Sequence, residues 1–398
     1  MINHMTKQVN RGGLVRVKGN VLSETGITKK IMTIENGVIK AISNPYDIED
    51  DNVINVDDSY IVPGFIDMHI HGLHYSLIDN GVKDLVEISK ELPRYGVTGF
   101  LPTVAPRPKG EDAEFLKRLS QTKVEGTRIL GFHLEGPFLK ITGSLTSEAI
   151  SGSDTGRVKA LIEAAKPYRA IFSISPDVEG IEQLIPLMAE NDTPVFITHT
   201  AANVEQTQRA IALGARHATH FYDVFPCPEI SDPGVRPCGA VEAILANETV
   251  SVDFILDGVH VDPIAVKMAL VSKQNGPGRV CLITDANVGA GLEPGRFVFG
   301  GSGEIEFAYK GAPARLVKDN TLAGSGLTMD QALRNAIKWL NLELPQAINL
   351  VSKNPAEILG LETKKGTLAV GYDADFTILD KNYNVLQTWI GGQCRYKI

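Results

Sequence analysis

The sequence predicts an α/β fold, namely a closed (β/α)8 barrel of the TIM type with a small β-sandwich domain formed from the N- and C-terminal segments. In the middle of the chain, short apolar runs alternate with amphipathic stretches, and polar residues follow several of these runs. This is the pattern of parallel strands joined by helices, with a site at the strand ends. In addition, no GxGxxG turn follows the first strand, so an open doubly wound sheet is the weaker alternative.

The two ends of the chain differ from the middle because they carry short alternating strands and tight turns. The turn Glu35-Asn36-Gly37 separates two such strands near the N-terminus, and Gly391-Gly392 follows another near the C-terminus. Asn-Gly and Gly-Gly between alternating apolar residues are typical of β-hairpins. We therefore expect residues 1–62 and 360–398 to form the small β-domain and residues 63–359 to form the barrel.

The middle of the chain supplies enough strands and helices for a barrel. Its 398 residues, 43% of them hydrophobic, are sufficient for a large core. Amphipathic segments predict helices over 81–95, 155–166, 178–191 and 204–213. Beyond the first strand, which ends near residue 70, apolar runs predict strands over 98–103, 128–134, 170–174, 194–198, 217–220, 249–255 and 280–284.

Composition narrows the class of protein and its compartment. Lys and Arg total 39 against 47 Asp and Glu, a net charge of −8, which argues against nucleic acid or an anionic membrane as the partner. No run approaches the ~18 apolar residues of a membrane helix, and the first residues show no apolar signal region. The four cysteines form no CxxC pair and are interpreted as free thiols. We expect a cytoplasmic protein that acts on a small molecule.

The most informative motif is His69-Ile70-His71-Gly72 at the end of the first predicted barrel strand. Residues i and i+2 of a strand point to the same face, so His69 and His71 would present both imidazoles on one side. Two converging imidazoles form half of a metal site.

Four further polar residues follow later apolar runs at the same position relative to the strand. A carboxylate there would be costly to bury unless it were solvated, paired or bound to a cation. Imidazoles and carboxylates are ligands that Zn²⁺ and similar divalent metals prefer. These residues are Glu135, His199, His220 and Asp285.

The order His-x-His, Glu, His, His, Asp resembles the amidohydrolase superfamily and, within it, the N-acetylglucosamine-6-phosphate deacetylases. The resemblance spans nearly the whole chain. The phrases most similar to those of the deacetylases are His133-Leu134-Glu135-Gly136-Pro137, Gly258-Val259-His260-Val261 and Leu322-Ala323-Gly324-Ser325.

The resemblance implies a role for each ligand. Glu135, His199 and His220 would hold the principal metal, and His69 and His71 a second one, with Glu135 bridging the two. One or two ions are both compatible with the family. Zinc fits these ligands, and iron, cobalt and manganese fit them as well.

The implied reaction is metal-dependent hydrolysis of an N-acyl amide, namely deacetylation of N-acetylglucosamine 6-phosphate or a related N-acetyl amino sugar. Asp285 would take a proton from the attacking water and return it to the leaving nitrogen. By analogy with the family, a homodimer is expected.

The positions that would contact the substrate only partly follow the family pattern. His260 matches, but segment 139–146 lacks the histidine that the family usually carries there, and Asp223 replaces a neutral amide. Residues 231–234 lack the expected arginine, for which Arg236 is the candidate substitute. A lost arginine and an added carboxylate both disfavour a phosphate dianion.

Two alternative functions therefore stay open. One is a divergent amidohydrolase that acts on a different, non-phosphorylated N-acyl or cyclic amide, and the other is a catalytically silent metal-binding protein. The many glycines after Asp285 predict a mobile loop that covers the site. His74 and His217 are interpreted as structural or surface residues.

Overall fold

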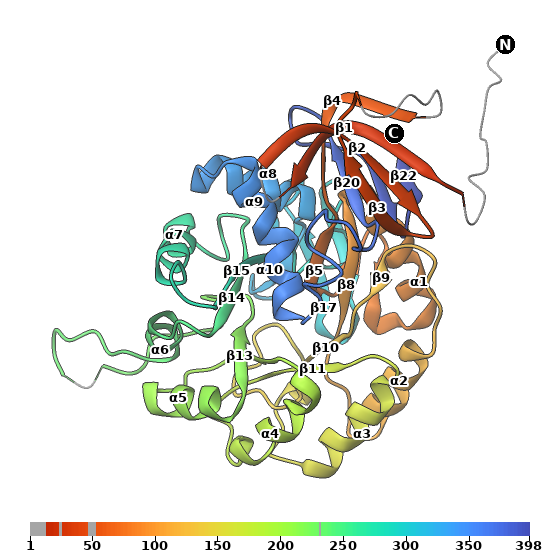
Figure 1. Ribbon diagram of the computed structural model, residues 1–398. Helices are drawn as coiled ribbons and strands as arrows, with labels where there is room; N and C mark the ends of the chain where they lie inside the picture. The colour runs from red at the N-terminus through yellow and green to blue at the C-terminus, as the bar shows by residue number, and fades with distance from the viewer. Residues whose placement is uncertain (1–12, 24–25, 47–52, 231) are drawn as a thin grey trace.

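A closed parallel barrel forms the centre of the protein (Figure 1) in a computed structural model that describes residues 13–23, 26–46, 53–230 and 232–398. In this described part, parallel strands run in the order β15-β14-β13-β12-β11-β10-β8-β5. The ring closes where Ile70 pairs with Ala286 in parallel, and the Asp285 backbone N–H donates to the His69 carbonyl at 2.9 Å. The (β/α)8 prediction is confirmed. The barrel strands are β5 (Phe65–Ile70), β8 (Val97–Val104), β10 (Phe132–Glu135), β11 (Ala170–Ile174), β12 (Val195–Ile197), β13 (Ala215–Ala218), β14 (Ser251–Ile255) and β15 (Val280–Ile283).

Helices surround the barrel (Figure 1) because each presents an apolar face to the strands. The helices predicted over 81–95, 155–166 and 204–213 are present. The segment 178–191 is instead broken into the short helix α4 and a 3-10 turn on either side of it, since Gly180 and Asn191 adopt left-handed backbone angles. The helices are α1 (Val82–Glu91), α2 (Glu111–Ser120), α3 (Thr155–Ala165), α4 (Ile185–Met188), α5 (Val204–Leu213), α6 (Ala240–Ala246), α7 (Pro263–Ser272), α8 (Met329–Leu340), α9 (Leu344–Val351) and α10 (Lys353–Ile358).

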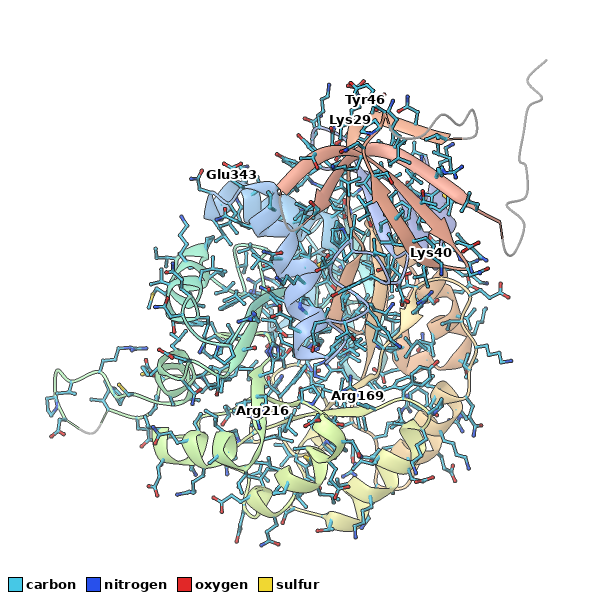
Figure 2. The ribbon with its side chains drawn as sticks, in the orientation of Figure 1. Lys29, Lys40, Tyr46, Arg169, Arg216 and Glu343 are labelled. Carbon is cyan, nitrogen blue, oxygen red and sulfur yellow. The ribbon has the colours of Figure 1, made fainter. Side chains whose placement is uncertain are left out.

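Strands from both ends of the chain form a separate sheet at one end of the barrel (Figure 1), in the order β22-β21-β20-β4-β1-β2-β3. Val17 and Ile34 share one core with Phe376 and Trp389, so the two ends stabilise each other. Lys29 and Lys40 lie on its outer surface (Figure 2). The strands are β1 (Val15–Ser23), β2 (Gly26–Glu35), β3 (Val38–Ser43), β4 (Val53–Pro63), β20 (Phe376–Leu379), β21 (Val385–Ile390) and β22 (Gln393–Lys397).

The two turns expected in this sheet have the backbone that hairpin turns require. Asn36 and Gly37 have φ of 52° and 78°, and Gly391 and Gly392 have φ of 56° and 72°, as two-residue turns with both φ positive demand. The domain boundaries at 62 and 360 stay a prediction, and residues 1–12, 24–25 and 47–52 of the expected N-terminal segment lie outside the described residues.

The glycine-rich segment after Asp285 is a small antiparallel sheet rather than the expected loop. Phe299, Ile305 and Phe307 are buried in a core of its own. Gly300 lies in the tight connection between its first two strands, and Gly303 begins the second of them. The many glycines concealed this alternation of large apolar residues in the sequence. The strands are β16 (Gly295–Phe299), β17 (Gly303–Phe307), β18 (Pro313–Leu316) and β19 (Leu322–Ser325).

Candidate metal and catalytic site

Six polar side chains meet at the carboxyl end of the barrel strands. They come from separate parts of the chain, and each is almost completely buried. This end of the barrel is where active sites form in this fold. His69 lies in β5 and His71 just after it, Glu135 ends β10, and His199, His220 and Asp285 follow β12, β13 and β15.

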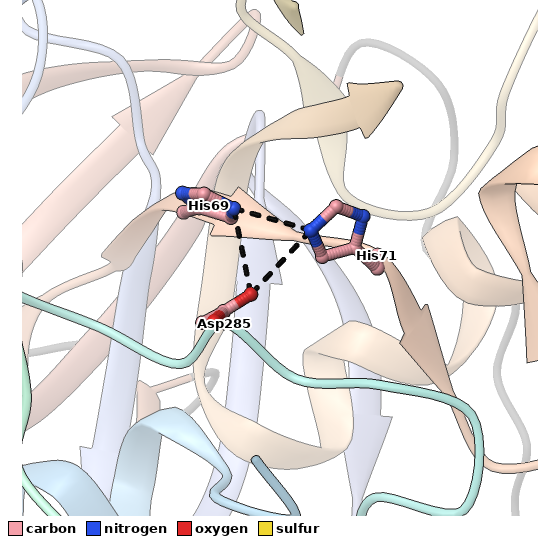
Figure 3. A group of neighbouring side chains, drawn as sticks. All are labelled: His69, His71 and Asp285. Carbon is pink, nitrogen blue, oxygen red and sulfur yellow. Dashed lines mark hydrogen bonds and ion pairs between the residues drawn. The ribbon is translucent and has the colours of Figure 1, made fainter. Parts of the chain in front are cut away.

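His69, His71 and Asp285 form a tight triangle (Figure 3). The two Nε2 atoms lie 3.2 Å apart, and Asp285 Oδ1 lies 3.4 Å from the Nε2 of His69 and 3.5 Å from that of His71. The spacing i and i+2 does place both imidazoles on one face, as the sequence predicted. Asp285 reaches them because its backbone N–H pairs with the His69 carbonyl where the barrel closes.

Glu135 connects this triangle to the remaining histidines. Its Oε1 lies 3.0 Å from His220 Nε2, 3.2 Å from His199 Nε2 and 3.7 Å from His69 Nε2. Its Oε2 lies 3.1 Å from His71 Nε2. Burial by itself would raise the pKa of Glu135, but the surrounding imidazoles outweigh burial and hold that pKa well below its usual range. The carboxylate is therefore ionised at neutral pH.

These donor atoms fit a divalent cation. Within the described residues, His69, His71 and Asp285 form one group whose ligand atoms lie within 4.8 Å of one another, and His69, Glu135 and His220 form a second such group. His199 Nδ1–H donates to the Ile141 carbonyl at 2.8 Å, which leaves its Nε2 lone pair directed at the cluster. Asp285 Oδ1 is buried without a hydrogen-bond partner in the described part of the chain. Two imidazole nitrogens that face each other beside a carboxylate are ligands that suit a divalent cation.

Metal binding at this site should become tighter as pH rises. In the metal-free protein, burial opposes protonation, but hydrogen bonds to Glu135 outweigh it and raise the pKa of His71 to about 9 and of His220 to about 10. Both imidazoles therefore hold protons at pH 7 that a cation must displace, so affinity should rise about tenfold per pH unit for each proton released. Titration against a chromophoric chelator at pH 6, 7 and 8 measures this slope. A pH-independent affinity would contradict the expectation.

Three residues of the site adopt backbone angles that are rare outside glycine. The φ angles of His199, His220 and Asp285 are 49°, 32° and 44°, all in the left-handed region. Each residue follows the end of a barrel strand, where the left-handed turn directs its side chain over the mouth of the barrel. Such strain concentrates at functional sites, and the Asp253 carboxylate, which accepts the His220 backbone N–H at 2.6 Å, helps to hold it here.

A chain of hydrogen bonds inside the barrel orients His69. Asp253 Oδ1 lies 3.2 Å from the Thr219 hydroxyl, which lies 3.1 Å from His69 Nδ1. Because a carboxylate only accepts, the Thr219 O–H donates to Asp253 and its oxygen accepts from His69 Nδ1–H. The Nε2 of His69 is then free to bind a cation. This relay was not predicted from the sequence, although His217 in β13 and Thr219 just after it are two residues apart. His217 Nε2 pairs with Asp253 at 2.6 Å, a structural role as predicted.

Removing the Thr219 hydroxyl should weaken metal binding. In Thr219→Val, His69 Nδ1 loses its acceptor and the imidazole can rotate or change tautomer, so we expect the dissociation constant to rise about 10- to 100-fold. Chelator competition measures the constant. Thr219→Ser keeps the hydroxyl and should bind as the wild type does, whereas wild-type affinity in the valine variant would show that the relay does not orient His69.

A cavity of about 230 Å³ opens onto the cluster. The antiparallel sheet β16–β19 supplies one wall through Phe299 and β19. The segment 143–145, part of the segment 139–146 considered in the sequence analysis, also contributes, as does Asn287, which was not predicted. The lining residues are His71, Glu135, Gly143, Ser144, Leu145, His199, His220, Asp223, Val224, Asp285, Asn287, Phe299, Thr321, Leu322, Ala323 and Gly324.

The three residues predicted to contact substrate lie in different places. Asp223 lines the cavity. His260 is buried nearby, with Nδ1 bonded to Asp257 Oδ2 at 2.7 Å and Nε2 without a hydrogen-bond partner among the described residues. Arg236 lies outside the cavity with a side chain 69% exposed, and it pairs with Glu242. Ser231 of the same loop lies outside the described residues.

The sequence profile of the Amidohydrolase family matches residues 60–395, which contain the barrel and every residue of the cluster. The chain belongs to the amidohydrolase family. Membership makes this amidohydrolase a hydrolase of amide-type carbon–nitrogen bonds, and the resemblance inferred from the motifs is confirmed.

Individual relatives match this amidohydrolase along nearly its full length. The N-acetylglucosamine-6-phosphate deacetylase of Bacillus subtilis is 31% identical over 348 residues, 85% of either chain. The N-acetylgalactosamine-6-phosphate deacetylase of Escherichia coli O157:H7 is 29% identical over 386 residues, 96% of this chain and 98% of that one. A solved structure of a Mycobacterium smegmatis N-acetyl-D-glucosamine-6-phosphate deacetylase mutant, in complex with N-acetyl-D-glucosamine-6-phosphate, has a TM-score of 0.86 at 26% identity and covers 97% of this chain and 100% of its own.

Proposed function

We propose that this protein is a metal-dependent deacetylase that hydrolyses the acetamido group of an N-acetyl amino sugar. The observation that carries the proposal is the Asp285 carboxylate on the lining of an open cavity, with its buried Oδ1 within 3.5 Å of two imidazole nitrogens and without a hydrogen bond among the described residues. The relatives named as amino sugar deacetylases support the same reaction.

The metal ligands proposed are Glu135, His199 and His220 for a principal ion, and His69 and His71 for a second ion bridged by Glu135. Glu135 Oε1 lies 3.0 Å from His220 Nε2 and 3.2 Å from His199 Nε2, and its Oε2 lies 3.1 Å from His71 Nε2, which supports this division. Zinc is our first choice of metal because imidazole and carboxylate suit it. When bound, a divalent cation supplies Lewis-acid polarisation of a carbonyl and of water.

Asp285 moves the proton in the proposed reaction. Its carboxylate accepts a proton from the water whose oxygen bonds to the amide carbonyl carbon. It then returns this proton to the nitrogen as the carbon–nitrogen bond breaks, which gives acetate and a free amine. Asp285 is among the residues that line the cavity, which supports access of its carboxylate to both atoms. Asp223 and His260 are proposed to contact the rest of the substrate. Arg236, which lies outside the cavity of the single chain and pairs with Glu242, stays a proposal for the same role.

A homodimer is proposed from an apolar surface on α7. Ile264, Met268 and Val271 recur at the i, i+4 and i+7 positions of this helix and are all exposed, which is a pattern that a second copy would cover. The neighbouring loop before α6 projects from the barrel (Figure 1) and exposes Ile230 and Val235. Sedimentation of the wild type and of Met268→Lys tests this, because a wild-type monomer would contradict it.

A cytoplasmic location is proposed from the thiols. Cys227, Cys238 and Cys394 are exposed and unpaired, as a reducing compartment allows. Among the described residues, the structure contains no helix that is both long and apolar enough to cross a membrane.

The experiment that tests the function is acetate release by the purified, zinc-loaded protein from a panel of N-acetyl amino sugars. We expect turnover of at least one member. If no member is hydrolysed by protein with a confirmed metal content, the deacetylase proposal fails and the silent metal-binding protein becomes the better description.

A further inference from the structure

A buried carboxyl group that the proposed mechanism does not use lies beside the cluster. Asp67 lies in β5, two residues before His69, and is completely buried. Its Oδ1 accepts the backbone N–H of Thr284 at 3.2 Å, and its Oδ2 accepts the Thr284 hydroxyl at 2.6 Å. Asp67 thereby joins the first barrel strand to the residue that directly precedes Asp285.

The Thr284 hydroxyl also shapes the turn that carries Asp285. Its oxygen accepts the Ala286 backbone N–H at 3.2 Å, and a Thr side chain bonded to the N–H two residues further on closes a local turn. Asp285 is the middle residue of this turn and has the left-handed φ of 44°. A residue other than glycine keeps such an angle only where its surroundings hold it, and here one hydroxyl bonds on both sides of it.

Strand β19 fixes the backbone of the same turn. The Ser325 hydroxyl donates to the Thr284 carbonyl at 2.5 Å, and the Ser325 backbone N–H donates to the Asp285 carbonyl at 2.8 Å. A Cβ atom on Gly324 would lie 2.6 Å from the Asp285 carbonyl oxygen, so only glycine allows the strand to approach this closely. The motif Leu322-Ala323-Gly324-Ser325 of the sequence analysis therefore packs against the turn.

The carboxylate of Asp285 depends on this turn for its position. Its Oδ1 forms no hydrogen bond among the described residues, although it lies 3.4 Å from His69 Nε2 and 3.5 Å from His71 Nε2. A shift of the Asp285 backbone would therefore move the carboxylate relative to both imidazoles and to a bound substrate.

We infer that Thr284, braced by Asp67, is a positioning residue that sets the left-handed turn at Asp285 and thereby the place of its carboxylate in the cavity. This inference rests on the proposed function, because it concerns the residue that moves the proton there. Thr284 and Asp67, both in the described part of the chain, are not among the residues that line the cavity, so they act through Asp285 and not on the substrate.

Thr284→Val removes the hydroxyl and keeps the branched shape of the side chain. In the zinc-loaded full-length protein we expect kcat for the best N-acetyl amino sugar to fall about 10- to 100-fold, because a small displacement of a reacting group is costly. KM and metal content should stay at their wild-type values. Thr284→Ser keeps the hydroxyl and should recover most of the lost kcat, which a role in packing alone would not predict.

Thr377→Val is the matched control. The Thr377 hydroxyl is equally buried, in β20 of the terminal sheet, and donates to the Gly96 carbonyl at 2.9 Å. This variant loses a buried hydrogen bond as Thr284→Val does, so its Tm should fall while its kcat stays at the wild-type value.

Asp67→Ala tests the bracing contact. It should lower kcat by a factor similar to that of Thr284→Val, and the double variant should be little slower than either, because the two side chains act through one contact. Effects on kcat that multiply in the double variant would overturn the role of Asp67.

Wild-type kcat in Thr284→Val, or a serine variant as slow as the valine variant, would overturn the inference and leave the deacetylase proposal intact. If the wild type hydrolyses no sugar of the panel, the deacetylase proposal fails, and crystal structures of the wild type and of Thr284→Val decide the inference separately. Asp285 that leaves the left-handed region in the variant, with Oδ1 displaced from His69 Nε2, would support it. An unmoved Asp285 would overturn it.

Discussion

Asp285→Asn should reduce kcat for amide hydrolysis by about 10²- to 10⁴-fold, the range expected when a general acid–base group is removed. The amide cannot accept the proton of the attacking water, although it keeps the shape of the side chain beside His69 and His71. KM should change little. Steady-state kinetics on the best substrate, together with elemental analysis of bound metal, measures both effects.

Asp58→Asn is the matched control, because it makes the same chemical change on the terminal sheet, where the Asp58 side chain is 93% exposed. It should retain wild-type kcat. If Asp285→Asn also retains wild-type kcat while binding metal normally, Asp285 does not move the proton and the mechanism proposed above is wrong.

Glu135→Gln should abolish both metal retention and activity. Glu135 is the one side chain that contacts His69, His71, His199 and His220 together within the described cluster. An amide is a much weaker ligand than a carboxylate. Loss of a residue that only orients a ligand weakens metal binding about 10- to 100-fold, so loss of this ligand itself should weaken it by about 100-fold or more. Metal content after dialysis and recovery of activity on adding zinc are the measurements.

Wild-type protein stripped by a chelator should regain activity when zinc is restored, whereas the glutamine variant should not. Glu179→Gln serves as the surface control, since Glu179 is exposed. A glutamine variant that keeps a full complement of tightly bound metal would show that the ion depends on the other ligands alone.

The sequence predicted those site residues that stand at the ends of regular apolar strands. Buried parallel strands are apolar on both faces, so a histidine or carboxylate directly after such a run, as with Glu135 or Asp285, identifies a strand end and a ligand at once. Asp253 escaped notice because it lies within an apolar strand, where only the folded barrel shows that its partners are His217 and Thr219.

The position of Arg236 could not be predicted, for a different reason. Arg236 is close in sequence to the substrate motif, but sequence spacing does not fix the direction of a side chain on a long loop. Here Arg236 pairs with Glu242. The sheet β16–β19 was hidden for a related reason, since glycine is permissive in both loops and tight hairpins.

The closure of the barrel has a consequence for how the enzyme matures. The first and last barrel strands meet at the seam where Ile70 pairs with Ala286, and the same seam brings Asp285 to His69. Contacts between such distant parts of the chain form late, because closing a long loop costs entropy. A nascent or truncated chain without β15 would therefore still carry Glu135, His199 and His220 but have no complete catalytic centre. A metal ion held by residues from different barrel strands would add its binding free energy to barrel closure. The cellular supply of metal would therefore influence what fraction of the molecules folds completely.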